Sequence, residues 1–83
     1  MKLKYFAWVR ERVGLAEEDV TLPDGVDTGA ELIAWLRGRG EGYERAFHEE
    51  GVIRVAVDRR HVAHEAPVRG AAEVALFPPM TGG

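Results

Sequence analysis

The end of the sequence combines two prolines with two glycines, a pattern that suits chemistry at a backbone carboxyl. Pro78-Pro79 cannot continue a β-ladder, because proline has no backbone N–H and restrains the residue before it to extended geometry. Met80–Gly83 then has too little apolar surface and too much glycine to order itself. Fully extended, such a tail would reach on the order of 20 Å. We therefore expect a domain over residues 1–77 and a flexible tail over residues 78–83.

A tail of this kind has a physical use if its last carboxyl is the reacting group. Glycine has no Cβ, so Gly82 and Gly83 would let the backbone thread a narrow channel in another protein. An α-carboxyl, with an ordinary pKa of about 3.3–3.7, is ionised at neutral pH and can attack a phosphorus centre. Since glycine averages about 7% of residues, a chance Gly-Gly pair has odds of roughly one in two hundred. The Pro-Pro exit directly before the pair favours a chemical role over coincidence.

Composition restricts the other function classes. At 83 residues the chain has room for one core and no second lobe, so we expect no enclosed active site. The net charge is -3 and the basic residues are dispersed, which argues against a nucleic-acid partner. There is no cysteine, so any sulfur chemistry needs sulfur from outside. No signal peptide or long apolar span is visible, and we expect a cytoplasmic location and no membrane partner.

Side-chain periodicity predicts the first half of the domain. Residues 2–9 alternate with period two, which predicts a strand. Residues 10–13, followed by Gly14, predict a single helical turn, and residues 19–22 predict a second strand. The Thr28–Glu31 capping box then starts a helix. Its apolar stripe, which should pack in the core and end at Gly38 or Gly40, consists of Leu32, Ile33, Trp35 and Leu36.

The second half predicts a short helix over residues 43–50 and then strands. The third strand runs over residues 51–57, a turn over 58–60 leads to an edge strand at His61-Val62, and residues 73–77 form the last strand. The order of elements predicts an α+β fold, with a mixed sheet of four to five strands and one main helix packed on one face.

Three aromatic residues suggest a docking surface. If the first and last strands are neighbours, Phe6, Trp8 and Phe77 should project from the face of the sheet opposite the helix. The alternative is that the second short helix or a loop covers them. Arg10 is interpreted as a solvated arginine.

The remaining titratable residues give no sign of a catalytic centre. His61 and His64 lack a third ligand at suitable spacing, so we interpret them and His48 as surface residues and predict no metal site. Four acidic residues are likewise interpreted as solvated: Glu11, Glu17, Glu18 and Asp19. We assign no general acid or base within the chain.

Residues 73–83, with Phe77-Pro78-Pro79 and the final Gly-Gly, resemble the closing motif of the small subunit of molybdopterin synthase, a family of ubiquitin-like sulfur carriers. Tyr5–Glu11 and Val55–Asp58 are similar to that family in the same order. The family usually has Asn in place of Asp58, and a Gly-Asp pair in place of Ala71-Ala72. These departures lie in turns far along the sequence from the tail, and they weaken inferences about the loops.

The resemblance implies a β-grasp fold and a two-stage mechanism. A ubiquitin-activating-type adenylating enzyme would use ATP to activate the Gly83 carboxylate, and a sulfur donor would convert it to a thiocarboxylate. The tail would then enter the large subunit of the synthase, which holds the catalytic side chains, and would donate sulfur to the dithiolene of molybdopterin. The carrier itself would bind no cofactor. The resemblance implies catalytic roles for Gly82 and Gly83, and partner contacts at Phe6, Phe77, Pro78, Pro79, Met80 and Thr81.

Two alternatives remain open. One is a sulfur carrier of another pathway, such as thiazole synthesis for thiamine, although those carriers tend to be shorter and to lack the Phe77-Pro78-Pro79 exit. The other is a ubiquitin-like protein modifier, in which Gly83 would end in an isopeptide bond to a lysine.

Overall fold

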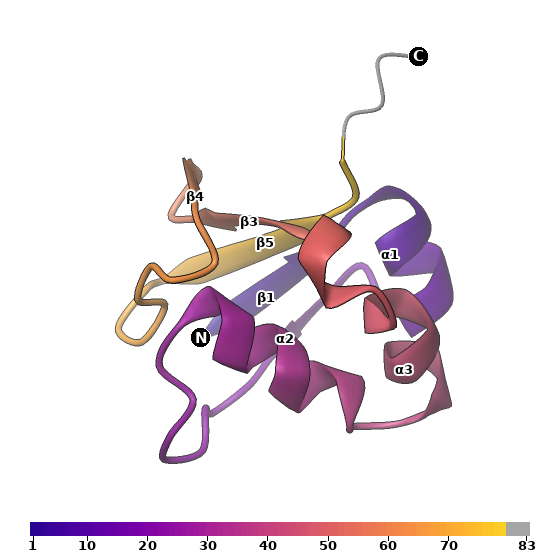
Figure 1. Ribbon diagram of the computed structural model, residues 1–83, viewed down its shortest axis with the longest axis horizontal. Coiled ribbons are helices and arrows are strands. Elements are labelled where there is room, and N and C mark those ends of the chain that lie inside the picture. Colours follow the sequence, from indigo (N-terminus) through magenta and orange to yellow (C-terminus); the bar gives the residue numbers. More distant parts are fainter. Residues whose placement is uncertain (80–83) are drawn as a thin grey trace.

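A five-stranded mixed sheet with helices packed against it forms the protein (Figure 1). The computed structural model describes residues 1–79. The strand order is β2-β1-β5-β3-β4; β1 and β5 are parallel, and the other neighbouring pairs are antiparallel. In chain order the elements are β1 Lys2–Tyr5, α1 Ala7–Val13, β2 Glu17–Asp19, α2 Gly29–Arg37, α3 Glu41–Phe47, the 3-10 helix η1 Glu50–Val52, β3 Arg54–Val57, β4 Arg60–Val62 and β5 Glu73–Phe77. The predicted α+β class and the pairing of first and last strands are confirmed.

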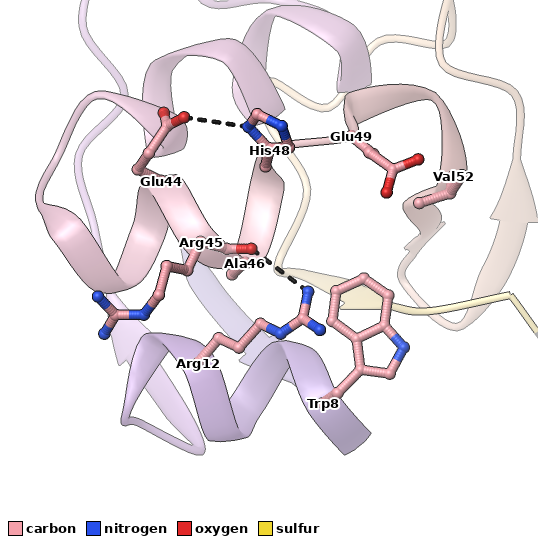
Figure 2. Close-up of a pocket in the computed structure, with 8 residues that line it drawn as sticks. All are labelled: Trp8, Arg12, Glu44, Arg45, Ala46, His48, Glu49 and Val52. Carbon is pink, nitrogen blue, oxygen red and sulfur yellow. Dashed lines mark hydrogen bonds and ion pairs between the residues drawn. The ribbon is translucent and has the colours of Figure 1, made fainter.

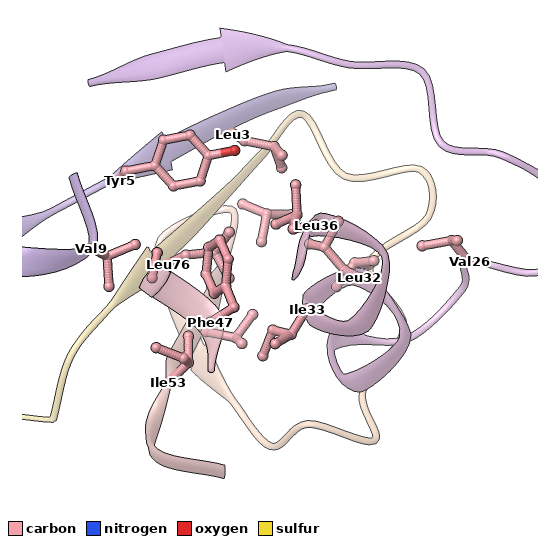
Figure 3. Packing of buried hydrophobic residues seen from close by; sticks show 14 of the residues in the cluster. Leu3, Tyr5, Val9, Val26, Leu32, Ile33, Leu36, Phe47, Ile53 and Leu76 are labelled. Atoms are coloured by element: carbon pink, nitrogen blue, oxygen red, sulfur yellow. The ribbon is translucent and has the colours of Figure 1, made fainter. Parts of the chain in front are cut away.

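The core lies between one face of the sheet and the helices, with α2 contributing the most residues and Val9 of α1 and Phe47 of α3 also buried in it (Figure 3). Leu32, Ile33 and Leu36 of α2 are fully buried, and they meet inward residues of the central strands such as Val74 and Leu76. Burying one such side chain contributes roughly 1.5–3 kcal/mol. The predicted inward face of β5 is therefore confirmed, and that of α2 is confirmed for its three aliphatic residues, while Trp35 is half-buried and packs against the core.

The start and end of α2 follow the predicted signals. The backbone N–H of Glu31 donates to Thr28 Oγ1 at 3.2 Å, and the Glu31 carboxylate accepts from the Thr28 N–H at 3.0 Å. The helix ends at Arg37, with Gly38 as its C-cap. The predicted main helix is correct. The short helix predicted over residues 43–50 is confirmed as α3, with bounds Glu41–Phe47, and the turn predicted over residues 10–13 is the end of a longer helix, α1.

The first predicted strand is wrong beyond Tyr5. β1 ends there, and the segment assigned to its second half is the start of α1. Val9 is still buried, as predicted, but from a helix, where it packs into the core. Gly14 ends α1 in a left-handed conformation at φ 91°, its N–H donating to the Arg10 carbonyl at 2.8 Å. The period-two pattern did not reveal the change from strand to helix, because Val9 fits an inward position of a strand as well as the buried face of a helix.

Other boundaries differ by a few residues. β2 covers Glu17–Asp19 rather than 19–22, and Leu22 is instead buried from a loop. Gly51 lies in η1 and not in the third strand, which begins at Arg54. The last strand has the predicted bounds, and the edge strand begins one residue earlier than predicted, at Arg60.

Candidate functional site

The central strand β5 leads directly to the base of the predicted tail. β5 lies between β1 and β3 and ends at Phe77, the residue predicted to close the last strand. Pro78 and Pro79 follow outside any regular element, and both are half-buried. The Phe6 N–H donates to the Leu76 carbonyl at 3.2 Å, so β1 supports β5 up to this end. The chain thus leaves the sheet from its middle.

Phe77 projects on the face of β5 opposite the core. Its neighbours in the strand, Val74 and Leu76, alternate inward and are fully buried, whereas Phe77 is half-buried. Its ring stacks on that of His61 in β4, with centroids 5.1 Å apart and planes 12° apart. On the adjacent strand β3, the register partner of Phe77 is Arg54. The ring is therefore held on one side by His61 of β4.

Phe6 lies beside this position at the end of β1. Tyr5 pairs with Leu76 in the parallel register, so the next residues on the two strands are Phe6 and Phe77. Phe6 is 46% exposed, an unusual value for so large an apolar side chain. Its backbone is extended, and the following Ala7 has φ 51°, a left-handed value that turns the chain into α1. The two aromatic residues named from the sequence are thus brought together.

Trp8 does not join them, which corrects the predicted aromatic cluster. It lies on α1, where the Arg12 guanidinium sits 4.2 Å from the centroid of its ring (Figure 2). Trp8 is half-buried and packs against the edge of the core. The physical reason is the early end of β1: once the chain turns into a helix, alternate residues no longer share a face.

Charged pairs occupy the same outer face of the sheet at its other end. Lys2 Nζ lies 3.2 Å from the Glu17 carboxylate, and Lys4 Nζ lies 3.5 Å from that of Glu73. The hydrogen bond and charge of Glu17 raise the pKa of Lys2. The Lys2–Glu17 pair is largely exposed and should contribute little stability, whereas Lys4 and Glu73 are half-buried. The outer face is therefore polar over β1 and β2 and aromatic near the tail.

The predicted reacting group lies outside the described residues. This holds for Met80, Thr81, Gly82 and Gly83, whose roles remain predictions. The boundary between a domain at 1–77 and a tail at 78–83 also remains a prediction.

A comparison with protein families decides the relationship. The family model described as the ThiS family matches residues 3–83. This chain belongs to the ThiS family. A relative from Haemophilus influenzae, named "Molybdopterin synthase sulfur carrier subunit", is 30% identical over 83 residues, which is 100% of this chain and 99% of the relative. The ThiS match thus includes the Phe77-Pro78-Pro79 exit and extends through Gly83.

Solved structures confirm the β-grasp, ubiquitin-like fold expected for a ThiS-family chain. A Pyrococcus furiosus protein assigned as molybdopterin converting factor, subunit 1, has a TM-score of 0.74 and 30% identity, covering 95% of each chain. Small archaeal modifier protein 1 of Haloferax volcanii has a TM-score of 0.68 and 27% identity, covering 96% of this chain and 97% of its own. The same fold therefore occurs in a protein named as a molybdopterin converting factor subunit and in a protein named as a modifier.

The three histidines of this ThiS chain have different surroundings and make different contacts. His48 is exposed and pairs with Glu44, and His61 is exposed but stacked. His64 is half-buried, with Nε2 2.6 Å from the Ile53 carbonyl, so interpreting it as a surface residue was wrong. Within residues 1–79, no group of three or more acidic or histidine side chains could hold a metal ion. None of the helices in this range is long and apolar enough to cross a membrane.

Glu18 is the residue that sequence reasoning missed. It was expected to be solvated, but it is half-buried and accepts the hydroxyls of Tyr5 at 2.7 Å and Tyr43 at 2.6 Å. Arg39 Nη1 adds an ion pair at 3.1 Å. Burial alone would raise the pKa of Glu18, but these donors outweigh it and lower the pKa. Burial and the nearby carboxylate raise the pKa of Tyr5.

The Glu18 cluster connects distant parts of the ThiS fold. It links the short edge strand β2 to β1, α3 and the turn after α2, so its position suits a structural role and not the tail chemistry. Both tyrosines are far from Glu18 in the sequence. They therefore form no local motif with it, and no spacing rule would have predicted the cluster.

Proposed function

We propose that this chain is the sulfur-carrier subunit of a molybdopterin synthase and that the α-carboxyl of Gly83 is its reacting group. The observation that carries the proposal is a ThiS-family match over residues 3–83, together with a carrier-named relative aligned over 100% of the chain. The exposed Phe6 and the half-buried Phe77 beside the tail base support it, since they offer an aromatic contact for the partner that receives the tail.

The proposed chemistry begins outside the synthase. The Gly83 carboxylate attacks the α-phosphorus of ATP on an adenylating enzyme, and pyrophosphate leaves. A sulfur donor then attacks the acyl carbon, AMP leaves, and the terminus becomes a thiocarboxylate. In the large synthase subunit this sulfur forms a bond to the pterin precursor as part of the dithiolene, and water cleaves the acyl–sulfur bond, so Gly83 returns to a carboxylate. The chain itself binds no cofactor in this scheme, and we propose that it works in the cytoplasm.

The fold contributes position instead of catalytic side chains. Pro78 and Pro79 have fixed φ values, so they stiffen the first step of the tail as it leaves the central strand. In the proposal, Phe6, Phe77, Pro78, Pro79, Met80 and Thr81 contact the partner, and Gly82 and Gly83 enter its channel. A terminal residue held at a defined distance from a docked domain is the positioning that such a transfer needs.

Intact-mass spectrometry tests the proposal. The chain is incubated with ATP, the adenylating enzyme and a sulfur source, and then with the large subunit and the pterin precursor. We expect a mass gain equal to the exchange of one oxygen for one sulfur, and its loss in the second step as molybdopterin forms. A chain that acquires sulfur but does not yield it to the large subunit would contradict the synthase assignment.

A second candidate is a protein modifier, favoured by the similarity to small archaeal modifier protein 1. The same activated carboxyl would then form an isopeptide bond with a lysine. Ladders of lysine-containing proteins that carry this chain, after incubation with ATP and the activating enzyme, would support this function. Their absence under conditions that produce the thiocarboxylate would favour the carrier.

A further inference from the structure

A groove on the helical side of the molecule is not used by the tail chemistry. It has a volume of about 580 Å³ and lies between α1 on one side and α3 with η1 on the other (Figure 2). Gly42 in α3 allows the two helices to approach, because a Cβ there would lie 2.6 Å from the Arg12 carbonyl oxygen. The close packing of α1 on α3 at Gly42 therefore fixes the two walls of the groove relative to each other.

The mouth of this groove lies beside the tail base. Because β3 and β5 are antiparallel and Arg54 pairs with Phe77, η1, which includes Val52 and lies directly before β3, is at the end of the sheet where the chain leaves β5. On the other side, the parallel pairing of β1 and β5 brings the start of α1, which includes Trp8, to the same place. Trp8 and Val52 both line the groove. A protein that encloses the tail must cover its base, and it then lies within reach of both side chains.

The groove combines an apolar mouth with free cations. Trp8 is half-buried and Val52 is 36% exposed, so both present apolar surface to solvent. Within residues 1–79, neither Arg12 nor Arg45 forms an ion pair. Arg12 donates to the Arg45 carbonyl at 3.4 Å, which keeps it over the Trp8 ring.

The carboxylates of the groove do not neutralise these cations. Glu44 is bound by Arg37 at 2.7 Å and by His48 at 3.3 Å. Glu49 comes from the segment before η1, near Val52 and across the groove from Arg12 (Figure 2). Arg12 on α1 and Arg45 on α3 thus face the groove as two positive charges that no carboxylate within residues 1–79 pairs with.

We propose that this groove receives a segment of the large synthase subunit, with an apolar side chain against Trp8 and Val52 and a carboxylate facing Arg12 and Arg45. The inference rests on the proposed function and extends it to a second contact region. One part of the partner covers Phe6 and Phe77, and another enters the groove. Contact on both sides of Pro78-Pro79 would set the direction in which the tail leaves the domain.

Calorimetric titration of the full-length chain with the large subunit tests the groove. The double variant Arg12→Glu/Arg45→Glu should weaken binding about tenfold or more, because it replaces attraction with repulsion. Val52→Asp, at an exposed position, should also weaken binding. The matched control is Arg59→Glu/Arg60→Glu, an equal charge change on the exposed β3–β4 hairpin, and it should bind like wild type. Thermal denaturation verifies that each variant is folded.

An NMR titration provides a second readout within one sample. In the ¹⁵N-labelled chain, the Trp8 indole resonance should shift when unlabelled large subunit is added, while that of Trp35, on α2, should not. If wild type binds and the folded groove variants bind equally, the groove inference is wrong and the carrier function stands. If wild type does not bind the large subunit at all, both are overturned.

Discussion

The imidazole ring of His61 lies nearly parallel to the phenyl ring of Phe77, with centroids 5.1 Å apart and planes 12° apart. His61 belongs to the edge strand β4 and Phe77 ends the central strand β5, so the stack spans β3. Such ring pairs contribute about 0.5–1.5 kcal/mol beyond area burial. A ring that is already held loses little conformational freedom when a partner covers it. We therefore expect the Phe77 ring to lose little conformational freedom in the proposed contact with a partner.

Phe77→Ala should therefore weaken binding to the large subunit more than it lowers stability. We expect a loss of about 2 kcal/mol or more in binding free energy. The free energy of unfolding should fall by only about 1 kcal/mol, because the ring is half-buried. Titration calorimetry and urea denaturation measure the two quantities. Leu15→Ala, which removes an apolar side chain 44% exposed elsewhere, is the control and should leave affinity unchanged. Equal affinity of wild type and Phe77→Ala would refute this contact.

Deletion of Gly83 should abolish sulfur transfer and leave the domain folded. The core that holds the domain together lies within residues 3–76, so the loss of the last residue removes none of it. Thiocarboxylate formation is followed by mass spectrometry, and the midpoint of thermal unfolding reports the fold. A chain extended by one alanine beyond Gly83 should fail in the same way. A deletion variant that still transfers sulfur would overturn the mechanism.

Ala7→Gly should stabilise the protein by about 0.5–1 kcal/mol. Ala7 has φ 51°, a left-handed value that costs an alanine roughly 1–2 kcal/mol and costs glycine little. Urea denaturation measures the difference. The control is Ala34→Gly, at an exposed position inside α2, where the same exchange should destabilise by about 1 kcal/mol. If both variants lose stability, the turn at Ala7 is not strained.

Glu18→Gln should remove a stabilisation that depends on pH. The pKa of Glu18 is lowered in the folded state, so its contribution is present above the ordinary value of 4.5 and is lost as pH falls through the folded pKa. At neutral pH the variant should lose about 1–2 kcal/mol, since Tyr5, Tyr43 and Arg39 lose a charged acceptor.

The measurement is urea denaturation of wild type and Glu18→Gln at a series of pH values. Their difference should be constant from neutral pH to about pH 4.5 and should shrink below it. Glu11→Gln, at an exposed position, is the control and should differ little from wild type at any pH. A constant difference for Glu18→Gln down to strongly acidic pH would show that the carboxylate charge is not responsible.

The sequence predicted correctly those elements that depend on interactions between neighbouring residues. The Thr28–Glu31 capping box starts α2 as expected, because cap and partner are three residues apart. Strand β5 over Glu73–Phe77 was also predicted correctly, since its alternation is strict and proline ends it. The resemblance to the family at Phe77-Pro78-Pro79 could likewise be recognised from neighbouring residues alone. The ThiS match bears out that family assignment.

Contacts between distant segments decided the rest. The turn from β1 into α1 depends on packing of Val9 in the core, and period two could not distinguish it from a longer strand. The Glu18 cluster, the His61 stack and the close approach of Gly42 to Arg12 each join residues far apart in the chain. By itself the sequence determined the order of elements and a chemically distinctive end, because those depend on neighbouring residues. Only the tertiary structure decided which side chains surround the tail base, because that depends on how sheet and helices pack.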